Sequence, residues 1–430
     1  MRQRVLAALG ANAFGQLVSI GIQLLSLPLF LSAWDVQRYG VWLMLSAMPA
    51  YLSMADVGMV ATAGNRMTMA MGRGDQAEAT AVFQSALCFM GITCVVLALL
   101  SLGFALLDPF HVLADDVQRL ALAALMMGVV VALFGGLAEA VLKARGLYAM
   151  GTLLANVVRL AEWGGFLLGL FCFGSLTAVA CGGLLARVLG TAWLIHRAQQ
   201  GDHPFAWRLK HARRQEVLSM AAPAVSFMAF PLANAITFQG VTLLVGGVLG
   251  PAAVVVFNTY RTMARVAVQI TGVFGHSLWA EFSRLYGQGG AMAVRALYRQ
   301  SALWGLLMAC AFSVALYAVG PWLLNIWTHG RIAFQPALML ALLAYAAVGG
   351  AWHVPRVLLM STNQHIGLAQ WGLLAALAAL LLSWIGAHAS ALNGVGLAML
   401  VSELGMALVC IRQAARLTAH PHNALPRYAS

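Results

Sequence analysis

Four polar side chains recur along one apolar segment near the middle of the chain, residues 251–272. They lie three, four and four positions apart, so a helix would carry them all on one face. The four residues are Asn258, Arg261, Arg265 and Gln269. Two arginines on one face supply fixed positive charge, and guanidinium groups pair well with phosphate oxygens. The stripe therefore predicts a binding site for an anionic, phosphorylated ligand.

The composition places this stripe in a membrane. Of the 430 residues, 62% are hydrophobic and only 9% are charged, whereas a soluble domain carries about 25% charged residues. Apolar runs of roughly 20 residues recur along the whole chain, and each can cross about 30 Å of hydrocarbon. A cation inside a bilayer is costly, so the two arginines are expected to face a wet cavity or a partner.

The hydropathy pattern predicts an all-α polytopic membrane protein with about twelve transmembrane helices. Both termini then lie on the same side of the membrane. The predicted spans are residues 5–31, 40–63, 80–107, 118–141, 152–174, 176–196, 216–246, 251–277, 301–324, 336–359, 367–388 and 391–411.

The charges of the connecting loops predict the orientation. Most arginines and both lysines fall in one set of loops and chain ends, and the opposite loops hold only Arg38, Arg119 and Arg331. The positive-inside rule then makes both termini cytoplasmic. The net charge of +12 reflects this orientation signal, and we do not interpret it as a nucleic-acid-binding surface.

The chain is expected to consist of two six-helix bundles. We expect the first at residues 1–200, a cytoplasmic linker at 201–215, the second at 216–411 and a cytoplasmic tail at 412–430. The segments GRGDQAEATAVFQSAL (72–87) and GQGGAMAVRALYRQSAL (287–303) occupy matching positions in the two halves. Six spans per half give a parallel repeat, for which a central substrate cavity is expected.

A second polar stripe follows the first predicted helix. Its members are Asn12, Gln16, Ser19, Gln23 and Ser26. Such residues commonly hydrogen-bond between membrane helices, so the stripe predicts either helix packing or a cavity lining. The candidates for substrate binding are therefore Arg261, Arg265, Asn258, Gln269, Arg187, Arg159, Asn12, Gln16 and Gln23.

Three carboxylates are candidates for coupling to an ion. Glu403 lies near the centre of the last span with no obvious local partner. Glu162 lies three residues after Arg159, so an alternative to a functional role is that the two side chains neutralise each other. Asp56 lies near an inner helix end, where a solvated carboxylate is ordinary. A buried carboxylate in a membrane helix is a candidate proton or sodium site.

The sequence offers no catalytic constellation, metal site or cofactor motif. The only lysines, Lys143 and Lys210, do not follow glycine, which excludes a Walker A phosphate loop. The six cysteines all fall in apolar segments without a CxxC pair, so they are expected to behave as small hydrophobic residues. We expect a protein that is not an enzyme and needs no cofactor.

Several stretches together resemble a known transporter family. They are LPLFLSAWDVQRYGVWLMLSA (27–47), MADVGMVATAGNRMTMAMGRGD (54–75) and WAEFSRLYGQGG (279–290). The chain is similar to the polysaccharide-transport branch of the multidrug/oligosaccharidyl-lipid/polysaccharide exporter (MOP) superfamily, which includes O-antigen flippases. The resemblance implies a bacterial inner-membrane flippase that moves a polyprenyl-pyrophosphate-linked oligosaccharide. It also implies membrane lipids as partners, and it leaves open whether a glycan polymerase is a further partner. No family motif assigns a substrate role to particular residues of this chain.

Two other functions are compatible with the sequence. One is an ion-coupled multidrug exporter of the same superfamily, although cationic drugs favour buried acids over arginines. The other is a membrane glycosyltransferase or polymerase that acts on lipid-linked sugars, which would normally present a substantial outer loop.

Overall fold

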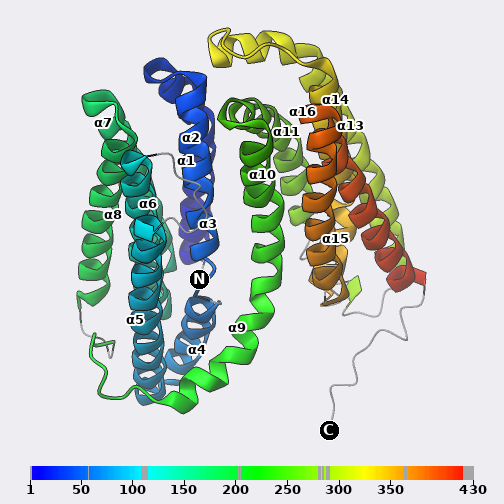
Figure 1. Cartoon of the computed structure of the whole chain (residues 1–430). Coiled ribbons are helices and arrows are strands. Elements are labelled where there is room, and N and C mark those ends of the chain that lie inside the picture. The colour runs from blue at the N-terminus through cyan, green and yellow to red at the C-terminus, as the bar shows by residue number, and fades with distance from the viewer. Residues whose placement is uncertain are drawn as a thin grey trace. The chain divides into compact units, whose positions relative to one another are not determined.

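The structure is a computed structural model, and it is helical in every element of the residues that it describes (Figure 1). Those residues are 2–56, 58–107, 115–201, 203, 205–278, 282, 285–286, 291–362 and 366–419. Nine helices in this part of the chain are long and apolar enough to cross a membrane. The prediction of an all-α polytopic membrane protein is confirmed.

The chain divides into two compact units, Met1–Pro231 and Leu232–Ser430. The boundary between these two units lies inside the helix Arg214–Ala235, and the division into two six-helix bundles with a linker at 201–215 stays a prediction. The predicted tail is helical up to Ala419. Residues 420–430 lie outside the described residues, as does most of the motif at 279–290, with the Gly-x-Gly of the second repeat copy.

The first unit contains the helices up to α9, whose last four residues belong to the second unit. They are α1 (Arg2–Ala33), α2 (Val36–Ala47), α3 (Pro49–Leu52), α4 (Met59–Arg73), α5 (Gln76–Leu107), α6 (Asp116–Ala144), α7 (Tyr148–Phe173), α8 (Leu176–Gln199) and α9 (Arg214–Ala235). Its core is built from apolar side chains of α4, α5 and α6, with Met67, Phe83 and Leu137 fully buried.

The second span of the sequence prediction, residues 40–63, is broken in the structure. Helix α2 ends at Ala47, the short α3 follows, and α4 starts at Met59 and continues to Arg73. The Asp56 carboxylate accepts a hydrogen bond from the Gly58 amide at 3.0 Å, and Gly58 has a left-handed backbone with φ 74°. This turn, which a glycine adopts without strain, separates α4 from the preceding helices.

The second unit contains the end of α9 and the remaining helices. They are the π-helical turn η1 (Ile236–Gly240), α10 (Val241–Leu249), α11 (Pro251–Ser277), α13 (Ala291–Thr328), α14 (Pro336–Ala351), α15 (His353–Ser361) and α16 (Ile366–Ala419). Helix α16 covers the last two predicted spans, with non-helical backbone at Ser390 and Ala391 between them. Helix α11 is not among the nine apolar helices, because its polar stripe lowers its hydropathy.

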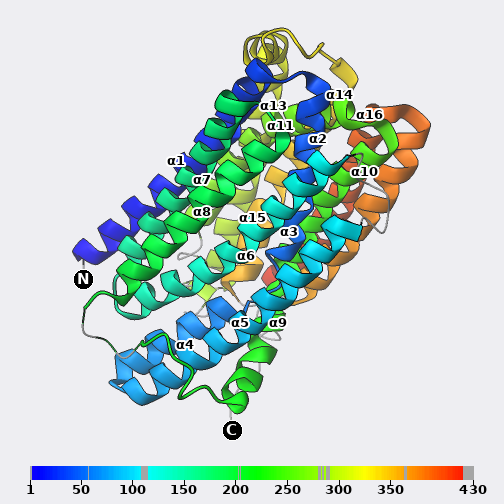
Figure 2. The ribbon, with the colours of Figure 1, turned by 60° about the vertical axis from the view of Figure 1, so that its left-hand side comes forward.

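Helices α7 and α8 lie side by side in both views (Figures 1 and 2). They are so close that their backbones are in contact. A methyl group at Gly165 would collide with the carbonyl oxygen of Gly182, and one at Gly169 would collide with that of Ala178. Small residues four apart on facing helices allow such close packing in membranes. The contact determines which polar side chains of the two helices meet.

Candidate substrate-binding site

The polar stripe of α11 lies within the second unit and its two arginines differ in exposure. Arg261 is only 8% exposed, whereas Arg265, one turn later, is exposed. Asn258 and Gln269 are half-buried on the same helix face. The sequence predicted one cationic face, but the structure separates a buried guanidinium from an accessible one.

The Arg261 guanidinium is held by neutral groups from two neighbouring elements. It donates to the carbonyl oxygen of Phe238 at 2.8 Å and to the Thr242 hydroxyl at 2.7 Å, and it also donates to the Asn258 side-chain oxygen. Thr242 in turn donates to the same Asn258 oxygen at 3.3 Å. Arg261 therefore has satisfied hydrogen bonds and is fixed in place.

One of these partners belongs to an irregular turn of helix. Phe238 lies in η1, the single π-helical turn between α9 and α10. Such turns are rare and occur mostly at functional sites. Since Arg261 bonds to the η1 backbone and to Thr242 in the first turn of α10, it links α11 to the irregular segment.

Aromatic rings complete the surroundings of the two cations. The Arg261 guanidinium carbon lies 5.2 Å from the Phe238 ring centroid and 5.0 Å from that of Phe257. The Arg265 guanidinium lies 5.0 Å from the same Phe238 ring. Cations are attracted to aromatic faces within about 6 Å. Phe238 thus contacts both arginines, so a movement of its ring would change the surroundings of both guanidinium groups.

Neither arginine forms an ion pair with a carboxylate among the residues that the structure describes. Arg265 is therefore an accessible cation on a membrane helix whose charge is not neutralised by an acid in the described part of the second unit.

The first polar stripe packs mainly against α7. Tyr148 donates to Asn12 at 3.3 Å, Arg159 donates to Ser19 at 2.9 Å, and Trp163 donates to Ser26 at 2.9 Å. These contacts support the packing interpretation for that edge of the helix. Gln16 is exposed and Gln23 half-buried, and they lie seven residues apart on the other edge of the stripe.

The ion pair suggested between Arg159 and Glu162 does not form. Glu162 instead pairs with Arg187 of α8, because the glycine contact brings α7 and α8 together. Arg159 is exposed and bonds to Ser19 of α1. Because Glu162 compensates the charge of Arg187, we do not propose a substrate-binding role for Arg187.

This ion pair leads to a prediction about stability. Glu162→Gln should lower the stability of the first unit by about 2 kcal/mol, because a partly buried arginine would lose its counter-charge. The double variant Glu162→Gln/Arg187→Met should recover most of that loss, because it removes both charges. The apparent Tm in detergent measures both effects. Equal losses in the single and double variants would contradict the prediction.

The other two carboxylates occupy different settings. Glu403 is half-buried on α16, and its Oε1 accepts a hydrogen bond from the Trp352 indole at 2.8 Å. No carboxylate–arginine ion pair involves Glu403 among the described residues. Asp56 caps the turn before α4, as described above, which is a structural role.

The predicted binding residues therefore fall into two groups, one in each unit. Asn258, Arg261, Arg265 and Gln269 lie on α11 in the second unit, and Asn12, Gln16, Gln23, Arg159 and Arg187 belong to the first. Sequence reasoning missed Phe238 and Thr242, which contact the arginines from other elements. Nothing in the spacing of these residues indicates that contact.

Solved structures match the chain over nearly its whole length. The inward-facing conformation of a multidrug resistance MATE family transporter of the MOP superfamily matches with a TM-score of 0.79 and 13% identity, over 97% of this chain and 100% of that one. The chain therefore has the same overall fold as that transporter. This finding bears out the resemblance at the level of the fold.

Two further solved structures also match the chain over most of its length. A mutant of the Vibrio cholerae MATE transporter VcmN matches with a TM-score of 0.61 and 18% identity, over 97% of this chain and 99% of that one. The lipid II flippase MurJ, in an inward closed conformation, matches with a TM-score of 0.67 and 11% identity, over 98% and 90%. No protein-family model and no curated protein matches the sequence. All three solved structures are of transport proteins.

Proposed function

We propose that this protein is a flippase that moves a polyprenyl-pyrophosphate-linked oligosaccharide across the bacterial cytoplasmic membrane by alternating access. The observation that carries the proposal is the exposed guanidinium of Arg265 on α11, with no carboxylate partner in the described residues. A cation in such a place needs an anion. A pyrophosphate supplies one and accepts paired hydrogen bonds from arginine.

The residues of the site would have separate roles. Arg265 contacts the pyrophosphate, and Gln269, one turn further on the same face, offers a neutral donor and acceptor beside it. Arg261, which is buried and donates three hydrogen bonds, fixes Phe238 and the η1 turn and so positions the ring against which Arg265 lies. Asn258 holds Arg261. Gln16 and Gln23 of the first unit are suited to hydrogen-bond sugar hydroxyls.

The similar structures are compatible with this proposal and with its main alternative. One is of a lipid II flippase and others are of multidrug transporters. The alternative, an ion-coupled multidrug exporter, is favoured by the higher TM-score of the MATE match. The cationic character of α11 favours an anionic cargo instead, because it would repel a cationic drug.

The experiment that separates these functions uses purified protein in liposomes. A fluorescent polyprenyl-pyrophosphate oligosaccharide is placed in one leaflet, and its appearance in the other is followed with a membrane-impermeant lectin. We expect movement well above that of protein-free liposomes. Absence of movement, together with drug extrusion by a susceptible host that expresses the protein, would support the exporter instead.

We further propose that Glu403 binds the coupling cation. Its Oε1 accepts a hydrogen bond from the neutral Trp352 indole, and among the described residues it forms no ion pair with a basic side chain. Binding of a cation at Glu403 would change the potential at Arg265 and hence its affinity for an anion. Glu162 and Asp56 already have structural partners, so they are not proposed for this role.

The role of Glu403 gives a prediction on coupling. In Glu403→Gln the acceleration of transport by an imposed proton or sodium gradient should vanish, whereas the slow movement without a gradient should persist, because Arg265 is intact. Transport is measured in liposomes with and without each gradient. Asp116→Asn, at a highly exposed carboxylate on α6, serves as the control. Unchanged acceleration in Glu403→Gln would exclude the residue from coupling.

A further inference from the structure

The connection between α8 and α9 is firmly attached to α5. We call residues 205–214 the basic strap. Phe205 is 1% exposed and packs edge-on against Phe83, with ring centroids 5.7 Å apart. Trp207 contacts the same ring at 5.5 Å. The strap is therefore anchored in the core of the first unit through its aromatic residues.

Two buried polar side chains of α5 hold the strap backbone. The Gln84 side-chain oxygen accepts from the His211 amide at 2.6 Å, and the Ser85 hydroxyl accepts from the Arg213 amide at 2.9 Å. Gln84 also donates to the carbonyl oxygen of Ala206 at 3.4 Å. Because buried polar groups need partners, these bonds fix the strap in one conformation.

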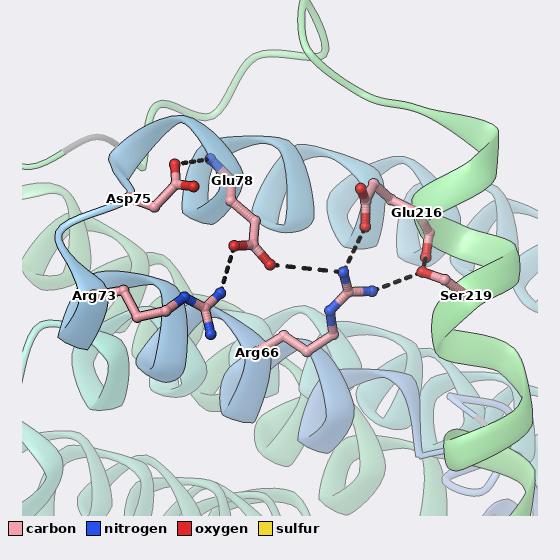
Figure 3. A network of polar contacts seen from close by, with 6 residues as sticks. All are labelled: Arg66, Arg73, Asp75, Glu78, Glu216 and Ser219. Atoms are coloured by element: carbon pink, nitrogen blue, oxygen red, sulfur yellow. Dashed lines mark hydrogen bonds and ion pairs between the residues drawn. The ribbon is translucent and has the colours of Figure 1, made fainter. Parts of the chain in front are cut away.

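The acids beside the strap are already paired (Figure 3). Arg66 of α4 binds Glu216 at 2.9 Å, lies 3.8 Å from Glu78, and donates to Ser219 at 2.7 Å, whereas Arg73 binds Glu78 at 2.5 Å. Asp75 caps the first turn of α5 by accepting from the Glu78 amide at 2.9 Å. These carboxylates are thus engaged by α4 and α5.

Four cationic side chains of the strap are left exposed. They are Arg208, Lys210, Arg213 and Arg214, and none has an ion-pair partner among the described residues. Two apolar side chains accompany them, Leu209 at 55% exposure and Leu218 of α9 at 61%. The surface combines positive charge with exposed leucines.

We propose that the basic strap binds the headgroups of anionic phospholipids in the leaflet predicted to be cytoplasmic. The strap follows the end of a membrane helix, where clustered lysines and arginines attract anionic lipids. Leu209 and Leu218 favour a lipid surface over an acidic protein or a free anion, since they insert at the boundary of the acyl chains. Because the backbone is already ordered, little conformational entropy is lost on binding.

The test counts lipids bound to the full-length protein by native mass spectrometry in detergent, with phosphatidylglycerol and phosphatidylcholine as probes. The wild type should retain phosphatidylglycerol preferentially. Arg208→Gln/Lys210→Gln/Arg213→Gln/Arg214→Gln should bind it at least about tenfold more weakly, because each cation contributes to the attraction. The single variant Lys210→Glu should also weaken phosphatidylglycerol binding. It replaces the quadruple variant in the test if that variant does not fold.

A matched control removes four exposed arginines elsewhere, Arg295, Arg299, Arg412 and Arg416. This variant should keep wild-type phosphatidylglycerol binding. Equal retention of the two lipids by the wild type, or an equal loss in the control, would overturn the proposal. Displacement of phosphatidylglycerol by polyglutamate at equal charge concentration would overturn it as well, in favour of an acidic protein partner.

Discussion

Arg265→Gln should reduce translocation of the lipid-linked oligosaccharide about 100-fold, because charge-assisted hydrogen bonds contribute about 1.5–3 kcal/mol each. The side chain is exposed, and its one aromatic or hydrogen-bond contact among the described residues is with the Phe238 ring. Its removal should therefore leave folding and membrane insertion intact. Initial rates in the liposome assay and the apparent Tm of the same preparation measure the two effects.

Two matched variants make this result interpretable. Arg265→Lys keeps the charge but loses the paired geometry, so we expect a loss of about tenfold. Arg299→Gln removes an exposed arginine on α13 and should transport at the wild-type rate. If Arg265→Gln itself transports normally, the anion site proposed on α11 does not exist.

Arg261→Met should lower both stability and transport, because Arg261 is a structural part of the site. Its loss deprives the Phe238 carbonyl, the Thr242 hydroxyl and the Asn258 amide of their charged donor. Removing a buried cation also relieves a desolvation cost, so we expect a net loss of about 2 kcal/mol. That corresponds to an apparent Tm lower by about 5 °C for a unit of this size.

Transport by Arg261→Met should fall more than about tenfold even though Arg265 is present, because Phe238 would no longer be fixed. The contrast between the two positions is the informative result, with Arg265→Gln losing transport alone and Arg261→Met losing stability as well. An Arg261→Met protein with the wild-type Tm would show that the bonds to η1 do not hold the turn.

The positions of most helices follow from sequence alone. The span predicted at 80–107 lies within α5, and the one predicted at 251–277 coincides with α11. Long apolar runs bounded by polar residues determine a membrane helix locally, because the bilayer fixes its length and backbone hydrogen bonding requires a helix. The span at 40–63 was wrong, since the turn around Gly58 depends on a left-handed backbone within an apolar run.

The partners of polar side chains do not follow from sequence. The spacing of Arg159 and Glu162 suggested a pair within one helix, but Glu162 meets Arg187 because glycines let α7 and α8 touch. Likewise, Arg261 and Arg265 look equivalent on a helical wheel. Only the packing of η1 and α10 against α11 buries the first and leaves the second exposed.

The sequence by itself determined that the chain is a helical membrane protein and that α11 carries two cations on one face, because hydropathy and helical periodicity are local properties. Tertiary structure alone decided which cation is accessible and which holds the η1 turn. The reason is physical. The exposure and hydrogen bonding of a side chain depend on neighbours such as Phe238 and Thr242, which come from another helix and which no spacing along the chain specifies.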